Sequence, residues 1–210
     1  MTGPLTVAVV LAAGSGSRFT GSAHKLLTDA QGRPVYQWAV ESALEANIGP
    51  VVVVTGKTNL PLDFALSNQA KESIKQWGQP LSLNNPDWST GMASSVQCAI
   101  AFAASLGAQS VVIGLADQPC VPPSAWHKVA NSTAPLAVAT YDTKRGNPVK
   151  LHAEMWSHLP TSGDEGARQL LRTHHELVEE VTCTGSAIDI DTVDDLELAS
   201  KLILESRRTN

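Results

Sequence analysis

The chain has 210 residues, 43% of them hydrophobic and 17% charged, so it is long enough to bury a core without disulfides or a structural metal. Its formal net charge of -5 argues against the basic surface that binds nucleic acid or an anionic membrane. The three cysteines are scattered, with neither a disulfide framework nor zinc-ligand spacing. We therefore expect one domain over residues 1–210 and no nucleic-acid or membrane partner.

The first apolar run, Val7–Leu11, follows a short N-terminal segment without basic residues. A run of this length cannot span a membrane, and it lacks the basic region that precedes the core of a signal peptide. It predicts a buried β-strand in a cytoplasmic protein.

Three further apolar runs predict buried parallel strands, because each is almost continuously hydrophobic: Val51–Thr55, Ser110–Leu115 and Leu136–Thr140. Apolar residues with helical spacing predict helices between them, over Val35–Glu45, Asp63–Trp77 and Met92–Ser105, and another helix beginning near Pro123. Strands that alternate with helices favour an α/β fold, here a single-domain, Rossmann-like, mostly parallel sheet flanked by helices.

The second half of the chain is less regular. Tyr141–Pro148 is rich in turn-forming residues and lies between two apolar runs, which indicates a hairpin or a long loop. Ala187–Asp191 is interpreted as a strand. Thr192 and Asp195 have the spacing of a helix N-cap and its acidic partner, so we expect a final helix from there to about Ser206.

A glycine-rich loop directly follows the first strand: Leu11, Ala12, Ala13, Gly14, Ser15, Gly16, Ser17 and Arg18. Small residues at this position let backbone N–H groups approach an anion closely. The loop is not a Walker A motif, because no Gly-Lys-Ser/Thr follows, and Phe19 replaces the third glycine of the dinucleotide-binding fingerprint. Taken alone, it is equally consistent with a tight turn.

Two cations follow the loop closely. Arg18 has the planar guanidinium that binds phosphate in a bidentate way, and Lys25 can act as a point charge on phosphate. Either residue alone is more often a solvated surface charge. Together with the glycine-rich turn they predict a cradle for a triphosphate.

Acidic residues occur at two places that can meet. Asp117 lies just after the apolar run Ser110–Leu115, with one residue between them. The carboxyl end of such a strand is where α/β folds bind ligands, and a carboxylate at this position is suited to Mg²⁺. Asp189 and Asp191 would share one face of a strand, and two carboxylates on one face call for a cation nearby. The alternatives are that Asp117 caps the helix near Pro123, that Asp191 belongs to the cap of the final helix, and that Asp189 faces solvent.

The segment Asn85–Ser95 precedes the helix predicted over Met92–Ser105. Its small polar residues are suited to a nucleobase or, at the helix N-terminus, to an anion. They are also ordinary turn and cap residues.

In combination, these motifs resemble those of the MobA-like nucleotidyltransferases. The resemblance runs in the family's order from near residue 5 to near residue 196, through Leu11–Phe19 with Lys25–Leu27, Asn85–Ser95, Leu115–Pro119, Gly146–Pro148, Gly163–Arg168 and Asp189–Thr192. It is strongest to the molybdenum cofactor cytidylyltransferases, since GTP-using relatives typically have Leu-Ala-Gly-Gly where this chain has Leu11–Gly14. In one departure, Thr20–His24 stands where the family usually has a glycine after the Arg-Phe pair.

The resemblance implies a fold of the nucleotide-diphospho-sugar transferase type, with an NTP-binding N-terminal half and an acceptor-binding C-terminal half. It implies catalytic roles for Arg18, Lys25 and Asp117, and an Mg²⁺ site at Asp117, Asp189 and Asp191. The implied nucleotide-binding residues are Leu11, Ala12, Ala13, Gly14, Ser15, Gly16, Arg18, Lys25, Asp87, Gly91, Ser94 and Ser95. The implied acceptor-binding residues are Gly146, Asn147, Pro148, Gly163, Asp164, Gly166 and Arg168.

The implied reaction transfers CMP from CTP to molybdenum-loaded molybdopterin and releases pyrophosphate, with a molybdoenzyme chaperone or recipient as a further partner. An acceptor phosphate monoester is largely dianionic near neutral pH, so the reaction requires no general base. The alternatives are a guanylyltransferase of molybdopterin, cytidylyl or guanylyl transfer to another phosphorylated small molecule, a dinucleotide-binding oxidoreductase, and a non-catalytic nucleotide-binding module.

Overall fold

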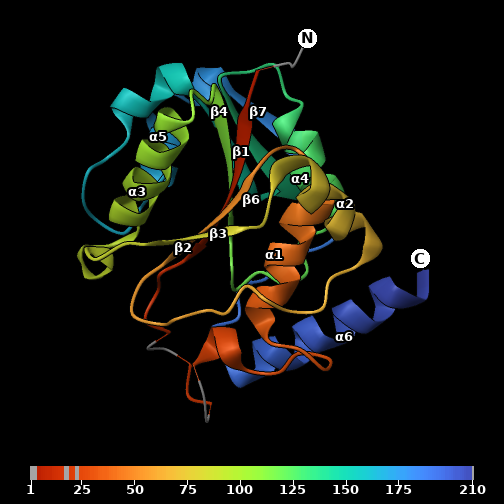
Figure 1. Ribbon diagram of the computed structural model, residues 1–210. Helices are drawn as coiled ribbons and strands as arrows, with labels where there is room; N and C mark the ends of the chain where they lie inside the picture. Colours follow the sequence, from red (N-terminus) through yellow and green to blue (C-terminus); the bar gives the residue numbers. More distant parts are fainter. Residues whose placement is uncertain (1–3, 17–18, 22–23, 210) are drawn as a thin grey trace.

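The computed structural model describes residues 4–16, 19–21 and 24–209, and a seven-stranded sheet forms its centre (Figure 1). The strands lie in the order β3-β2-β1-β4-β6-β5-β7. Their bounds are β1 Thr6–Ala12, β2 Val51–Thr55, β3 Leu81–Asn84, β4 Ser110–Leu115, β5 Leu136–Tyr141, β6 Lys144–His152 and β7 Val178–Thr182. Every pairing is parallel except those of β6, which runs antiparallel to β4 and β5. The predicted α/β class and mostly parallel sheet are confirmed.

Helices cover both faces of the sheet: α1 Val35–Glu45, α2 Asn68–Trp77, α3 Met92–Ser105, α4 Pro123–Ala130, α5 Arg168–Thr173 and α6 Val193–Thr209. Side chains that alternate along β1 enter two separate cores. Ala8 and Val10 pack on the side of α1, α4 and α6, whereas Val7 and Val9 pack on the side of α3 and α5. Strands buried on both faces are near-continuously apolar for this reason.

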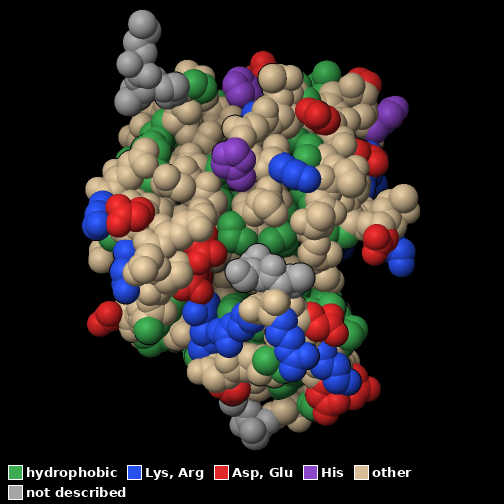
Figure 2. All heavy atoms as spheres, turned by 90° about the vertical axis from the view of Figure 1, so that its right-hand side faces the viewer, with side chains coloured by type: hydrophobic (Ala, Val, Ile, Leu, Met, Phe, Trp, Pro, Cys, Tyr) green, Lys and Arg blue, Asp and Glu red, His purple; other side chains and the backbone are tan. Residues whose placement is uncertain are grey.

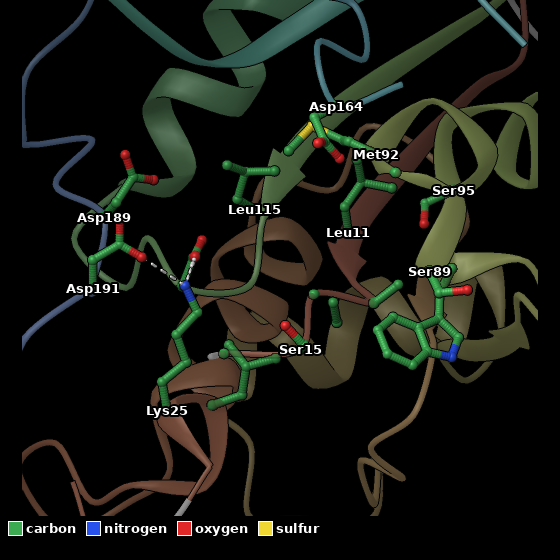
Figure 3. Close-up of a pocket in the computed structure, with 18 of the residues that line it drawn as sticks. Leu11, Ser15, Lys25, Ser89, Met92, Ser95, Leu115, Asp164, Asp189 and Asp191 are labelled. Carbon is green, nitrogen blue, oxygen red and sulfur yellow. Dashed lines mark hydrogen bonds and ion pairs between the residues drawn. The ribbon is translucent and has the colours of Figure 1, made fainter. Parts of the chain in front are cut away.

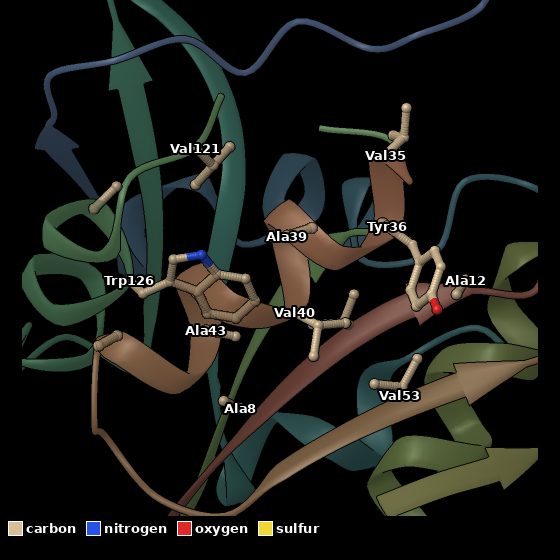
Figure 4. Packing of buried hydrophobic residues seen from close by; sticks show 14 of the residues in the cluster. Ala8, Ala12, Val35, Tyr36, Ala39, Val40, Ala43, Val53, Val121 and Trp126 are labelled. Atoms are coloured by element: carbon tan, nitrogen blue, oxygen red, sulfur yellow. The ribbon is translucent and has the colours of Figure 1, made fainter. Parts of the chain in front are cut away.

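The face of α1 that meets the sheet is built from small and β-branched residues. Ala39, Val40 and Ala43 are at most 2% exposed and lie over Ala8 and Val53 of the central strands (Figure 4). Small side chains let the helix approach closely, and this packing fixes the strand ends against which the site is built.

The hairpin predicted over Tyr141–Pro148 is present between β5 and β6. Asp142 and Thr143 form its tip with φ of 46° and 70°, a backbone conformation that suits the twist of a two-residue hairpin turn. The turn reverses the chain and so makes β6 antiparallel to β5, and β6 also pairs antiparallel with β4 on its other side.

Three expectations from the sequence were incomplete or wrong. The short edge strands β3 and β7 were missed, because their exposed residues give no continuous apolar run: Leu81 is 48% exposed. The helix predicted from Asp63 begins at Asn68, where Ser67 Oγ accepts a hydrogen bond from Ala70 N at 3.1 Å. Residues 187–191 are not a strand, although Ile190 N donates to Asp117 O at 3.0 Å.

The capping pair of the final helix is confirmed. Asp195 N donates to Thr192 Oγ1 at 3.1 Å, and Thr192 N donates to Asp195 Oδ2 at 2.8 Å. This reciprocal arrangement satisfies two N–H groups that the helix would otherwise leave unpaired. Asp191 N also donates to Asp195 Oδ2, at 3.2 Å, so the same cap holds the backbone of Asp191 in place.

On the face shown in Figure 2, basic side chains gather in the lower part with acidic side chains beside them. Charges of both signs are therefore mixed there. Within the described ranges, no helix combines the length and apolar character needed to cross a membrane.

Candidate active site

A cavity of about 700 Å³ opens at the carboxyl ends of β1 and β4 (Figure 3). Its size is in the usual range for small-molecule sites, and this edge of a parallel sheet is where α/β folds bind ligands. The side chains of Leu11, Leu115 and Lys25 reach it from three different segments.

The glycine-rich loop forms one wall of the cavity, which residues 11–16 all line. A Cβ at Gly14 would have no heavy atom within 4 Å, so the backbone there is open to a ligand. Gly16 has a φ of +64°, and its carbonyl accepts a hydrogen bond from Phe19 N at 3.0 Å. Arg18, expected to clamp phosphate, lies outside the described residues.

Lys25 begins a short 3₁₀ helix, Lys25–Leu27, in which the buried Leu26 anchors the chain. Its Nζ donates to Asp117 Oδ2 at 2.6 Å and to Asp191 Oδ1 at 3.2 Å, and its side chain is 11% exposed (Figure 3). The segment Thr20–His24 therefore does not keep the ammonium from the cavity. Burial lowers the pKa of Lys25, but the charges and hydrogen bonds of the two carboxylates outweigh it, so the net pKa is raised above 10.5.

Four aspartates line the cavity, and three of them, Asp117, Asp189 and Asp191, are those predicted to hold a metal. Asp117 follows β4 after one residue, and the bond from Ile190 N to its carbonyl brings the 187–191 segment alongside. Desolvation of the Asp189 carboxyl and the charge of Asp117 raise its pKa above 3.8, and a hydrogen bond from Gln118 partly offsets this. Asp189 and Asp191 thus line the same cavity, but not as neighbours on one face of a strand, because residues 187–191 form no strand.

The carboxylates suit a hard divalent cation. Within the described part of the chain, no three His, Cys, Asp or Glu side chains form a ready-made metal cage. Mg²⁺, however, is usually held by one or two carboxylates together with substrate phosphates. The ammonium of Lys25 between Asp117 and Asp191 indicates that this pair already gathers around a positive charge.

Another part of the wall comes from the 3₁₀ turn Trp88–Thr90 and the start of α3. Gly91 and Ser95 line the cavity, and so do Trp88, Ser89 and Met92, which belong to the predicted motif Asn85–Ser95 but were not named one by one as nucleotide-binding residues. Asp87 and Ser94 are not among the lining residues.

Buried Asn85 explains the position of Ser94. It is 3% exposed, and its Nδ2 donates to Ser94 Oγ at 2.9 Å and to Ser95 Oγ at 3.0 Å. Asp87 N donates to Asn85 Oδ1 at 3.0 Å. Asn85 therefore organises the turn before α3, and its burial could not be read from the sequence.

The segment Gly163–Arg168 forms a further part of the cavity wall, to which it contributes Asp164 and Arg168. Ala93 N donates to Gly163 O at 2.9 Å, and a Cβ on Gly91 would lie 2.5 Å from Gly163 O. This close backbone approach requires glycine at 91, whose φ is +114°. Gly163 and Gly166 are not lining residues.

The motif Gly146–Pro148 lies outside the lining. A Cβ on Gly146 would be 2.8 Å from Ala187 Cβ, so glycine is needed there for packing. Asn147 Nδ2 donates to Gln118 Oε1 at 3.1 Å, and Gln118 in turn donates to the carboxylate of Asp189. Gln118, which lies in the predicted motif Leu115–Pro119 but was given no role there, connects Gly146–Pro148 to the cavity.

The two acidic residues Asp189 and Asp195 predict opposite effects of pH on stability. The pKa of Asp189 is raised, so its ionisation destabilises the fold as pH rises above 3.8. Asp189→Asn should increase the melting temperature at neutral pH, but only modestly because Asp189 is exposed and solvent screens its charge, and the gain should vanish in acid.

Asp195 is the matched control. Hydrogen bonds from Thr192 lower its pKa below 3.8, so its contribution to stability is present above that value and is lost in acid. Asp195→Asn should therefore lower the melting temperature at neutral pH. Thermal unfolding of metal-free protein from about pH 3 to about pH 8 checks both signs, and equal signs would contradict this account.

The fold and the cavity define the class, an α/β protein with a ligand site at the carboxyl edge of its parallel strands. Residues 8–178 match the MobA-like NTP transferase domain. The chain belongs to that family.

Known proteins similar to this chain support the assignment. The purine catabolism protein PucB of Bacillus subtilis (strain 168) is 27% identical over 207 residues, which cover 96% of this chain and 98% of PucB. The crystal structure of Rv0371c from Mycobacterium tuberculosis H37Rv superposes with a TM-score of 0.73 at 21% identity and covers 95% of this chain and 100% of that one. The inositol-1-phosphate CTP transferase of T. maritima superposes with a TM-score of 0.66 at 15% identity and covers 96% and 98%. At these identities the two structures show the shared fold.

Proposed function

We propose that the protein is an Mg²⁺-dependent nucleotidyltransferase that transfers CMP from CTP to molybdenum-loaded molybdopterin and releases pyrophosphate. One observation carries the proposal: a single cavity brings together the glycine-rich loop, Lys25 and the carboxylates Asp117, Asp189 and Asp191. Backbone N–H groups, an ammonium and a carboxylate-held cation are the groups that phosphoryl-type transfer needs, because its main requirement is positioning and charge neutralisation.

The N-terminal half would hold the nucleotide. Residues 11–16 would bind the phosphates through the backbone, with Arg18 and Lys25 as cations. Gly91 and Ser95 would lie beside the base, with Trp88 and Met92 as apolar surface. Ser94 and Asp87 would contribute through the turn that Asn85 holds.

The C-terminal half would hold the acceptor. Arg168 lines the cavity and has no ion pair with any described residue, so its guanidinium is suited to an anionic group of the acceptor. Asp164 lies beside it on the same loop. Gly163 and Gly166 would shape that loop, and Gly146, Asn147 and Pro148 would support the site from behind.

In this mechanism an acceptor phosphate oxygen attacks the α-phosphorus of CTP in line, and pyrophosphate leaves. The acceptor phosphate is already largely dianionic, so no side chain has to remove a proton. Lys25 stays protonated because its pKa is raised, and it supplies positive charge to the phosphates throughout. Bound Mg²⁺, held by Asp117 with Asp189 or Asp191, would neutralise phosphate charge.

Two properties of relatives agree with parts of the proposal. The T. maritima neighbour is named a CTP transferase for inositol 1-phosphate, a small phosphorylated acceptor. Rv0371c is also known in complex with manganese, in a structure with 20% identity and a TM-score of 0.70 that covers 94% of this chain. The second candidate is therefore cytidylyl transfer to a different phosphorylated small molecule.

Pyrophosphate release from CTP, GTP, ATP and UTP, measured with Mg²⁺ and molybdenum-loaded molybdopterin, tests the proposal. Release with CTP alone, abolished when the acceptor is omitted, supports it. Release with GTP would move the protein to the guanylyl branch, and release only with another phosphorylated acceptor would favour the second candidate. CTP binding without release under any condition would indicate a non-catalytic module.

Gly14→Ala tests the role of the glycine-rich loop. The added Cβ meets no atom within 4 Å, so the melting temperature should be nearly unchanged. The methyl group would keep phosphate from the backbone, and KM for the nucleotide should rise at least ~10-fold, the effect of losing about one charge-assisted hydrogen bond. Gly32→Ala, at a glycine that does not line the cavity, is the control: its φ of +87° strains an alanine and should lower the melting temperature, but KM for the nucleotide should not change. An unchanged KM would show that phosphate does not approach Gly14.

A further inference from the structure

Gln118 follows Asp117 directly, and only 3% of its surface is exposed. Its Nε2 donates to Asp189 Oδ1 at 2.8 Å and to Ala187 O at 3.1 Å, and its Oε1 accepts from Asn147 Nδ2 at 3.1 Å. Both amide hydrogens and the amide oxygen are therefore engaged. Turning this buried amide would leave polar groups unpaired, which is costly.

The partners of Gln118 also fix the orientation of its side-chain amide, that is, which side the oxygen faces and which side the N–H groups face. Asn147 presents an N–H group from β6, whereas Asp189 and Ala187 present acceptors from the segment before α6. The backbone of Asn147 is itself held in place, because its main-chain carbonyl accepts a hydrogen bond from Tyr141 Oη at 2.7 Å. The oxygen of Gln118 must face β6, and its two N–H groups must face residues 187–189.

We propose that Gln118 is a positioning residue that holds the Asp189 carboxylate toward the cavity, and that Asn147 acts on the site through Gln118. The inference rests on the proposed function, in which Asp189 is a metal-side carboxylate. Gln118 supplies the only side-chain hydrogen bond to Asp189 within the described residues. Without it, repulsion from Asp117 would favour conformers of Asp189 that point into solvent.

Residues that orient metal ligands from behind typically change metal affinity by about 10- to 100-fold when they are replaced. Gln118→Met keeps the length of the side chain and removes its donors and acceptor. The measurement is Mn²⁺ binding to nucleotide-free protein, followed by the electron paramagnetic resonance of free Mn²⁺. Wild type, Gln118→Met, Asp189→Asn and the double variant form a mutant cycle.

Gln118→Met should bind Mn²⁺ about 10-fold more weakly than wild type. In the Asp189→Asn background the same change should have almost no effect, because the group on which Gln118 acts is already neutral. Unchanged affinity in Gln118→Met would overturn the inference. So would an equal loss in both backgrounds, since Gln118 would then act through general packing.

Asn147→Leu is the second variant, and it keeps the inference testable if Gln118→Met does not fold. It removes the N–H that fixes the amide oxygen and leaves Gln118 in place. Mn²⁺ affinity should fall by a smaller factor, again only when Asp189 is present, and wild-type affinity would overturn the role of Asn147. Wild-type protein that binds no Mn²⁺ even when a nucleotide is present would overturn the proposed function as well, whereas Mn²⁺ binding and turnover with an unaffected Gln118→Met would overturn this inference alone.

Discussion

Replacing Asp117 with alanine is expected to lower turnover at least ~100-fold, the loss typical when a group that stabilises charge in a transition state is removed. Asp117 lies two residues after the end of strand β4 and lines the cavity. Its Oδ2 accepts a hydrogen bond from Lys25 Nζ at 2.6 Å. Its removal takes away both a proposed metal ligand and the nearest partner of the ammonium. Steady-state pyrophosphate release at saturating CTP and Mg²⁺ measures the effect.

The fold should survive this change, because the backbone carbonyl that accepts from Ile190 N remains. Circular dichroism and thermal unfolding check this directly. Asp194→Ala is the matched control, since it removes an exposed aspartate in the first turn of α6 and should leave turnover unchanged. Near-wild-type turnover in a folded Asp117→Ala protein would remove Asp117 from the mechanism.

Replacing Lys25 with methionine is expected to have two opposite effects. Turnover should fall at least ~100-fold, because the phosphates lose a preorganised positive charge. Mn²⁺ affinity of the nucleotide-free protein should rise, because the ammonium that now lies between Asp117 and Asp191 competes with any cation there. Methionine keeps the length of the buried stem, so packing against the cavity is largely preserved.

The two effects of Lys25→Met can be separated by experiment. Lys75→Met removes an exposed lysine whose ion pair with Glu72 lies on the surface of α2, and it should change neither quantity. Lower or equal Mn²⁺ affinity in Lys25→Met would show that the lysine does not compete with the metal. Turnover close to that of wild type would show that Lys25 does not act on the phosphates.

Much of the fold was predictable from sequence, because buried strands and amphipathic helices leave local patterns. The strands around Val7–Leu11 and Ser110–Leu115 and the helix Val35–Glu45 were located from apolar runs and periodicity. The edge strands β3 and β7 were not, because strands exposed on a sheet edge lack a continuous apolar run.

The candidate site was predictable in part. Gly14 and Asp117 each follow a parallel strand, so their closeness in space could be predicted from the rule that parallel strands present their carboxyl ends at the same edge of the sheet. The contact between Lys25 and Asp117 joins residues 92 positions apart, and no local pattern encodes it. Gln118 and Asn85 lie in motifs that the sequence analysis selected, but neither received a role, because their importance depends on burial and on their hydrogen-bond partners.

The sequence by itself determined the α/β class, the glycine-rich turn, the capping pair at Thr192 and the family resemblance, since these depend on residues close together in the chain or on motif order. Only the tertiary structure decided which polar residues face the cavity. The hydrogen bond from Ile190 N to Asp117 O brings residues 187–191 beside the end of β4, so that Asp189 and Asp191 line the cavity, whereas Asn147 is linked to Asp189 only through Gln118. That outcome depends on long-range contacts, whose geometry short-range periodicity does not contain.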